Sequence, residues 1–186
     1  MATYLAPYSA AFFNATPSLP DALQKHLEAG GNERVHQDFE TLFQEHGVEK
    51  ILGLGLMHHH FALEDDEYLT DVRGTSTAWK SCTGTRPSVW GFDANEKRLT
   101  PLEFAMDDDN DSVAYPDWQS PQMRDFLEKL SGLILQLGVN DTYGLVRYPG
   151  DNFPGRVEMT VGRANVNLTP AQVCNVPYNK YREPPI

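Results

Sequence analysis

The feature of the sequence that most constrains its fold is an apolar segment that ends in three consecutive histidines. Residues 52–61 read Leu-Gly-Leu-Gly-Leu-Met-His-His-His-Phe. Side chains of a β-strand alternate between its two faces. A strand over residues 50–63 would therefore place His58 and His60 in one row with the three leucines, and His59 on the opposite face. The pattern predicts an imidazole pair at the rim of the core.

The same segment is apolar on both faces, which is typical of a central strand that is covered on both sides. Gly53 and Gly55 would let a helix approach one of these faces closely. The acidic residues 64–67 predict a turn, and residues 68–73 predict a return strand. The histidine pair would then lie where this central strand ends.

Three helices are predicted from their capping residues and from apolar residues at helical spacing. Ser18 caps the first, and the glycines at 30–31 end it. The second spans residues 32–46. Ser120 caps the third, whose apolar face is the clearest in the chain, and Gly138 ends it.

The remaining segments predict strands and turns. Residues 89–92 and 99–104 predict a hairpin, and Pro101 would place its second arm near a sheet edge. Further strands are predicted at 143–148, 156–161 and 165–168, and irregular segments at 1–18 and 170–186. Together these elements predict a single α+β domain over residues 1–186, with a mainly antiparallel sheet covered by two or three helices.

Length and charge restrict the classes of function. A chain of 186 residues suits one domain with a sizeable core. The net charge of −11 argues against binding to nucleic-acid phosphates. No apolar run approaches the roughly 20 residues of a membrane span, and the first residues lack a secretory pattern. We therefore expect a cytoplasmic protein, free thiols at Cys82 and Cys174, and neither nucleic acid nor membrane as a partner.

An internal echo relates two parts of the chain. A Gly-Val pair, four intervening residues and a Gly-Leu pair begin at Gly47 and again at Gly138, 91 residues on (138 − 47). The Thr-x-x-Arg at residues 70–73 recurs at 160–163. Two interpretations stay open: two similar helix–strand–strand halves that share one sheet, or coincidence. The histidine pair has no counterpart in the second copy.

The first chemical hypothesis is a metal site. His58 and His60 on one strand face could bind the same ion, and neutral imidazole suits zinc, copper, iron or nickel. Glu64 follows four residues later and is the predicted third ligand. The implied cofactor is a divalent transition metal.

Two other hypotheses need no metal. A strand-end histidine in a half-buried pocket can act as a general acid or base near neutral pH. Glu64 and Glu67 would then orient the pair, while Arg73 or Arg147 would hold an anionic substrate. Alternatively, the histidines are structural and form hydrogen bonds with backbone carbonyls or carboxylates.

The run from Gly53 to Leu63, with the downstream Gly-Thr-Ser-Thr-Ala-Trp of residues 74–79, resembles a motif in a family of uncharacterised fungal cytosolic proteins. In that family an apolar strand ends in His-x-His-Phe and leads into an acidic turn. The resemblance covers residues 40–165. It implies that His58 and His60 are the important pair and, by analogy, a role in specialised metabolism.

These observations favour a small-molecule enzyme with a half-buried pocket at the C-terminal end of the 50–63 strand. His58 and His60 would serve there as metal ligands or as general acid and base. The alternative is a non-catalytic domain that binds a ligand or another protein.

Overall fold

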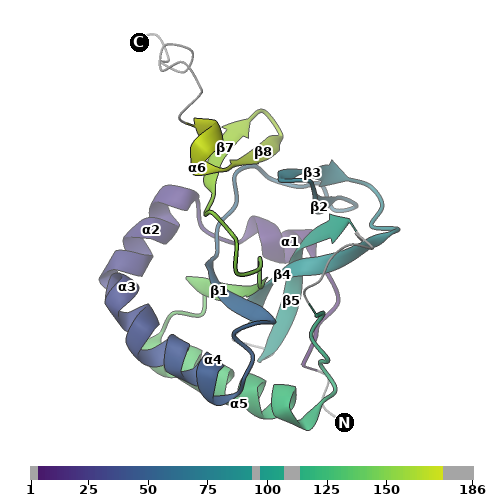
Figure 1. Ribbon diagram of the computed structural model, residues 1–186. Coiled ribbons are helices and arrows are strands. Elements are labelled where there is room, and N and C mark those ends of the chain that lie inside the picture. The colour runs from purple at the N-terminus through teal and green to yellow at the C-terminus, as the bar shows by residue number, and fades with distance from the viewer. Residues whose placement is uncertain (1–3, 94–96, 107–113, 174–186) are drawn as a thin grey trace.

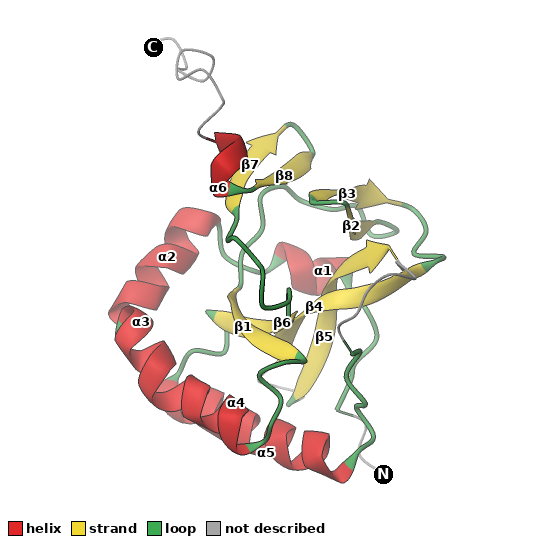
Figure 2. Ribbon diagram, in the orientation of Figure 1, coloured by secondary structure: helices red, strands yellow, loops and turns green. Residues whose placement is uncertain are grey.

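The chain folds into a curled, mixed β-sheet of eight strands with helices along its sides (Figure 1 and Figure 2), an α+β fold. The computed structural model describes residues 4–93, 97–106 and 114–173. Cys174 and the predicted tail beyond residue 173 lie outside the described residues. Within that part of the chain, none of the helices has the length and apolar character needed to cross a membrane.

Helices and strands both occur in the first and the second half of the chain. In chain order, the helical segments are α1 (Ala10–Asn14), α2 (Leu19–Glu28), α3 (Gly31–Arg34), the π-helical η1 (Val35–Glu40), α4 (Thr41–Glu45), α5 (Pro121–Leu137) and α6 (Pro170–Val173). The strands are β1 (Leu52–Leu56), β2 (Tyr68–Val72), β3 (Thr75–Trp79), β4 (Thr85–Asp93), β5 (Arg98–Met106), β6 (Tyr143–Arg147), β7 (Val157–Val161) and β8 (Ala164–Leu168).

The helix ends follow from local sequence. The hydroxyl oxygen of Ser18 accepts a hydrogen bond from a backbone N–H in the first turn of α2, and that of Ser120 does the same for α5. Gly138 ends α5 in the left-handed conformation (φ +66°). The predicted helix over residues 32–46 is a continuous run of α3, η1 and α4. The N-terminal segment is not irregular throughout, because Ser9 caps the short helix α1.

The strand order is β1-β6-β4-β5-β2-β3-β8-β7, and all neighbours are antiparallel except β2 and β5. The β4–β5 hairpin and the strands β6, β7 and β8 confirm the predictions for those segments. β5 lies inside the sheet, so Pro101 is not on an edge strand. The pairing of β5 with β2 begins only at Glu103, and therefore Pro101 has a strand partner on β4 alone.

The predictions for the 50–63 segment need correction. β1 ends at Leu56, and the histidines follow in a segment outside any strand. β1 is the outermost strand at one end of the sheet rather than a central strand, since it pairs with β6 alone. β2 does not return beside β1 but pairs with β3 and β5.

The two faces of β1 have different surroundings. Its leucines pack into the main core, together with Phe126 and Leu130 of α5 and with Phe39 of η1. On the opposite face, no helix of the described residues lies within 4 Å of a Cβ atom added to Gly53 or Gly55. A Cβ atom on either glycine would instead meet the side chain of Val146 on β6. Because glycine has no side chain, Gly53 and Gly55 leave room for the side chain of Val146 on the neighbouring strand.

Two strand pairs join the first part of the chain to the second, and one of them, β1 with β6, carries the Gly-Leu echo. Strands β2 and β7, which contain the echoed Thr70 and Thr160, do not pair with each other. β1 pairs with β6, and Leu54 lies opposite Leu145, 91 residues later (145 − 54). β3 pairs with β8, and Ser76 lies opposite Asn165, 89 residues later (165 − 76). In both strand pairs, two residues that face each other across the strands are therefore about 90 positions apart in the sequence, which is close to the offset of the echo.

We predict opposite effects for two Gly→Ala variants. A Cβ on Gly144 of β6 would overlap the sulfur of Met57 and the carbonyl oxygen of Trp90. Because a backbone atom cannot yield easily, Gly144→Ala should lower the free energy of unfolding by about 1–3 kcal/mol. The exposed Gly132 of α5 has open space around it, so Gly132→Ala should raise that energy by about 0.5–1 kcal/mol. Urea unfolding measures both, and equal effects would contradict the packing described for β6.

Candidate metal centre

A cavity of about 250 Å³ lies beside the segment that follows β1. Its lining includes the three histidines, Gly55 and Val146, and also Glu158 of β7. Gly55 and Val146 stand on the face of β1 and β6 that points away from the leucines and the helices. The histidine pair therefore does not extend the leucine row into the main core. It faces a hollow on the opposite side of the sheet.

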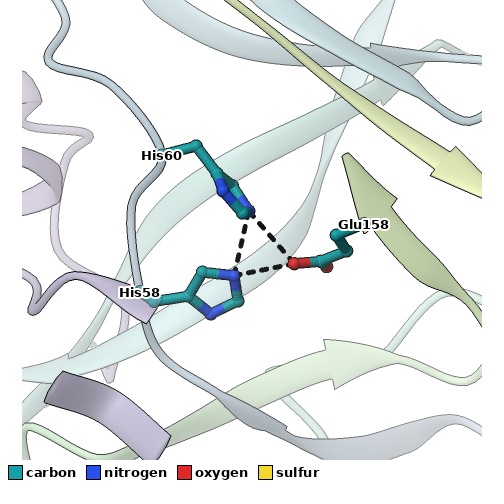
Figure 3. A group of neighbouring side chains, drawn as sticks. All are labelled: His58, His60 and Glu158. Atoms are coloured by element: carbon teal, nitrogen blue, oxygen red, sulfur yellow. Dashed lines mark hydrogen bonds and ion pairs between the residues drawn. The ribbon is translucent and has the colours of Figure 1, made fainter. Parts of the chain in front are cut away.

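Two histidines and one carboxylate converge at this cavity (Figure 3). The Nε2 atoms of His58 and His60 are 3.1 Å apart. The Oε2 atom of Glu158 lies 2.9 Å from Nε2 of His58 and 3.0 Å from Nε2 of His60. The two imidazoles have 13% of their side-chain surface exposed, and the Glu158 side chain has 30%. The three atoms thus form a nearly equilateral triangle that solvent reaches only in part.

The outward-facing nitrogen of each ring is also engaged. Nδ1 of His58 lies 3.0 Å from the carbonyl oxygen of Leu56 and must donate, because a carbonyl only accepts. Nδ1 of His60 lies 2.8 Å from the hydroxyl of Thr160 on β7. With the proton of His58 held at Nδ1, its neutral ring presents a lone pair at Nε2. The same follows for His60 when the Thr160 hydroxyl accepts.

Three electron-rich atoms this close repel one another unless a cation lies between them. Without a metal, a proton on one of the facing Nε2 atoms relieves this repulsion. Burial alone would lower the pKa of His58, but the hydrogen bond and negative charge of Glu158 outweigh burial and raise it. Burial and the positive charge of His58 lower the pKa of His60. The hydrogen bond from His58 likewise lowers the pKa of Glu158.

His59 points away from the pair, as the alternation predicted. Its Nδ1 lies 2.6 Å from the backbone carbonyl oxygen of Thr16, in the link between α1 and α2. His58 and His60 therefore share one side of an extended backbone, although that backbone is not part of β1. Through this contact, His59 holds the segment against the link between the N-terminal helices α1 and α2.

The two nearby acidic residues that the sequence indicated lie apart from this cluster. Glu64 is exposed, and one of its oxygens is 3.5 Å from the Lys80 ammonium. Glu67 is buried and binds the Arg163 guanidinium through both carboxylate oxygens, which lowers its pKa to about 2. The carboxylate beside the histidines is Glu158, 100 residues after His58. The prediction of Glu64 as third ligand assumed closeness in sequence.

The predicted arginines are also distributed differently. Arg73 is exposed in the β2–β3 turn (φ +55°) and does not line the histidine cavity. Arg147 lines a neighbouring cavity of about 390 Å³. Arg156, which immediately precedes β7, lines both cavities. Of these three, Arg156 is the arginine at the histidine site.

A half-buried carboxylate on β5 was not predicted. Glu103 lines both cavities, and the hydroxyl of Ser76 donates a hydrogen bond to its Oε1. Burial raises its pKa to about 7. The signal in the sequence was a single acidic residue between the apolar Leu102 and Phe104. Glu158 carried no comparable signal, because it sits in a strand with alternating polar residues.

Comparison of the chain with known protein families, with curated proteins and with solved structures gave no match. The resemblance to the fungal proteins therefore stays a prediction. Any functional conclusion depends on the geometry of the site itself.

We predict that Glu158→Gln lowers the pKa of His58 in metal-free protein to below its ordinary value of 6.5, because burial persists while the stabilising charge is lost. Imidazole NMR titration after chelator treatment measures this pKa. Glu64→Gln is the matched control and should leave it unchanged. A pKa that is equal in wild type and Glu158→Gln would contradict the contact.

The same pair makes stability depend on pH. Stabilisation by Glu158, whose folded-state pKa is lowered, is lost as pH falls through that value. Stabilisation by His58, whose folded-state pKa is raised, is lost as pH rises through it. The difference in unfolding free energy between wild type and Glu158→Gln should therefore be largest between these two pKa values, and it should shrink on either side.

Proposed function

We propose that this chain is a metal-dependent enzyme for a small molecule, with one divalent transition-metal ion bound by His58, His60 and Glu158. The observation that carries the proposal is the convergence of three electron-rich atoms 2.9–3.1 Å apart, with the outer nitrogens of both rings already engaged. Two imidazoles and a carboxylate are common transition-metal ligands, and such outer partners orient them.

The spacing of the three atoms fits an octahedral ion, and it is also the spacing of ordinary hydrogen bonds. Ligand atoms about 2.1 Å from an octahedral ion lie about 3.0 Å apart when they occupy neighbouring positions, against about 3.4 Å around a tetrahedral ion. The triangle matches the first value. Three protein ligands on one face leave the opposite face for substrate and water, an arrangement typical of non-haem iron sites. A closed structural zinc site would need a fourth protein ligand.

The surrounding residues supply what a reaction would need besides the ion. Glu103 lies in the same cavity and, with a pKa of about 7, can give up or accept a proton near neutral pH. The apolar side chains of Val89, Leu102 and Val146 line the same cavity and limit the access of water. In this proposal the acid–base role belongs to Glu103, and the histidines are ligands.

A second candidate, a protein-interaction domain, has one observation in its favour. Leu19, Leu23 and Leu27 form a stripe along α2 with 37%, 50% and 60% of their surface exposed. This stripe belongs to a helix, whereas the metal cluster lies after β1 and on β7. The two functions are therefore compatible in one chain.

We also infer that the fold consists of two related halves, one running through β1, β2 and β3 and the other through β6, β7 and β8. The pairing of β1 with β6 and of β3 with β8, at offsets of 91 and 89 residues, supports this inference. The histidines would then come from the first half and Glu158 from the second.

The proposal predicts that chelator-treated protein binds one equivalent of Fe²⁺ or Co²⁺ and becomes more resistant to thermal unfolding. Loss of any one ligand should weaken metal affinity strongly, as tested in His58→Ala, His60→Ala and Glu158→Ala. The loss should exceed the 10- to 100-fold expected when a residue that only hydrogen-bonds to a ligand is removed. Calorimetric titration measures this affinity. The control Glu64→Gln should bind like wild type. Absence of stoichiometric binding to the wild type would overturn the metal centre.

A further prediction concerns Thr160, which touches no ion but holds Nδ1 of His60. Thr160→Val keeps the shape of the side chain and removes the hydroxyl. We expect metal affinity to fall by about 10- to 100-fold while one equivalent still binds at saturation. Thr75→Val, on strand β3, is the control. Unchanged affinity in Thr160→Val would show that His60 needs no partner to keep its orientation.

A further inference from the structure

The histidine cavity opens into a longer cleft. Its volume is about 250 Å³ and that of the neighbouring cavity is about 390 Å³. The two cavities share four lining residues: Val89, Glu103, Val146 and Arg156. Because they share these walls, they form adjoining parts of one cleft. The metal-ligand cluster lies in the smaller part, and the larger part extends along β4, β5 and β6.

Arg156 stands at the junction of the two parts. Its guanidinium lies over the ring of Phe153, with Cζ 5.3 Å from the ring centre. Within the described ranges it forms no hydrogen bond or ion pair, in contrast to Arg163, whose guanidinium is bound by Glu67. Its positive charge does act on Glu103 and partly opposes the effect of burial there. The side chain thus offers a planar pair of N–H donors to the cleft.

The other charges in the cleft restrict what such an arginine can hold. Asp71, Glu103 and Glu158 contribute carboxylates to its lining, and Arg147 contributes a second guanidinium in the larger part. A doubly charged phosphate would meet strong repulsion from these groups, whereas a single carboxylate needs only one guanidinium. Much of the remaining wall is apolar, including Val146 and Phe153. A ligand that fits this wall has an apolar body and one negative charge.

We propose that the cleft binds a small monocarboxylic acid with an apolar body, its carboxylate on the Arg156 guanidinium and its other end beside His58, His60 and Glu158. The position of the reacting end rests on the proposed metal-dependent function. The carboxylate contact depends on Arg156 alone. The two parts of the site can therefore be tested separately.

The test measures binding of phenylacetate to the full chain, metal-free and Co²⁺-loaded, by calorimetry. The uncharged phenylacetamide has the same body and should bind at least about tenfold more weakly, because it lacks the charge-assisted hydrogen bonds. Arg156→Gln should weaken phenylacetate binding at least about tenfold and should not weaken Co²⁺ binding, because it removes a positive charge from the same cavity. Arg156→Lys keeps the charge but not the paired donors, so its phenylacetate affinity should lie between those of wild type and Arg156→Gln. Arg73→Gln is the control with the same change in charge and should bind like wild type.

The outcomes separate this inference from the proposed function. Phenylacetate binding that depends on Arg156 in a protein without metal affinity would support the carboxylate site and overturn the metal centre. Stoichiometric Co²⁺ binding without preference for phenylacetate over phenylacetamide would overturn the carboxylate site. Equal phenylacetate affinity in wild type, Arg156→Gln and Arg73→Gln would overturn it as well. Because Arg156 is exposed, its variants should fold, and circular dichroism checks this.

Discussion

The contact between Glu158 and the histidine pair joins the two ends of one curled sheet. β1 and β7 are the outermost strands in the sheet order, yet the segment after β1 meets the side chain of a β7 residue. Twist accumulates from strand to strand, and in this sheet it carries the far hairpin back toward the first strand. The site therefore exists only when the whole sheet has formed, and an ion bound there would stabilise the closed sheet as well as supply chemistry.

Two charged clusters in the chain show how a structural contact differs from a candidate site. Arg163 and Glu67 match donors with acceptors, so that pair needs nothing further. The histidine cluster directs two ring nitrogens and one carboxylate oxygen at a single point, and His58 holds a proton on its outer nitrogen. A fold under selection for stability alone would pair such groups with donors, because partly satisfied buried polar groups are costly. In the proposed function, this arrangement is that of a site prepared for a cation.

The parts of the structure that the sequence predicted are those controlled by local chemistry. Ser18, Ser120 and Gly138 mark helix ends because their capping groups act within one turn, and alternation correctly separated His59 from its neighbours. The sheet order and the third ligand depend on contacts between distant segments. Glu158 comes from 100 residues away, so no spacing near the histidines could indicate it. Glu64 was predicted as a ligand because it is close to the histidines in sequence, but it belongs to a turn that leads the chain away from them.

The alternation of leucine and glycine in β1 explains why a cavity forms at this strand. The leucines fill the helical side of the sheet, whereas Gly53 and Gly55 leave the other side without side chains. Val146 of the paired strand occupies part of this space, and the remainder is the hollow that the histidines face. A larger residue at Gly55 would push the valine toward the ligands. One strand thus provides both a dense core and an open site, because its two faces carry residues of opposite size.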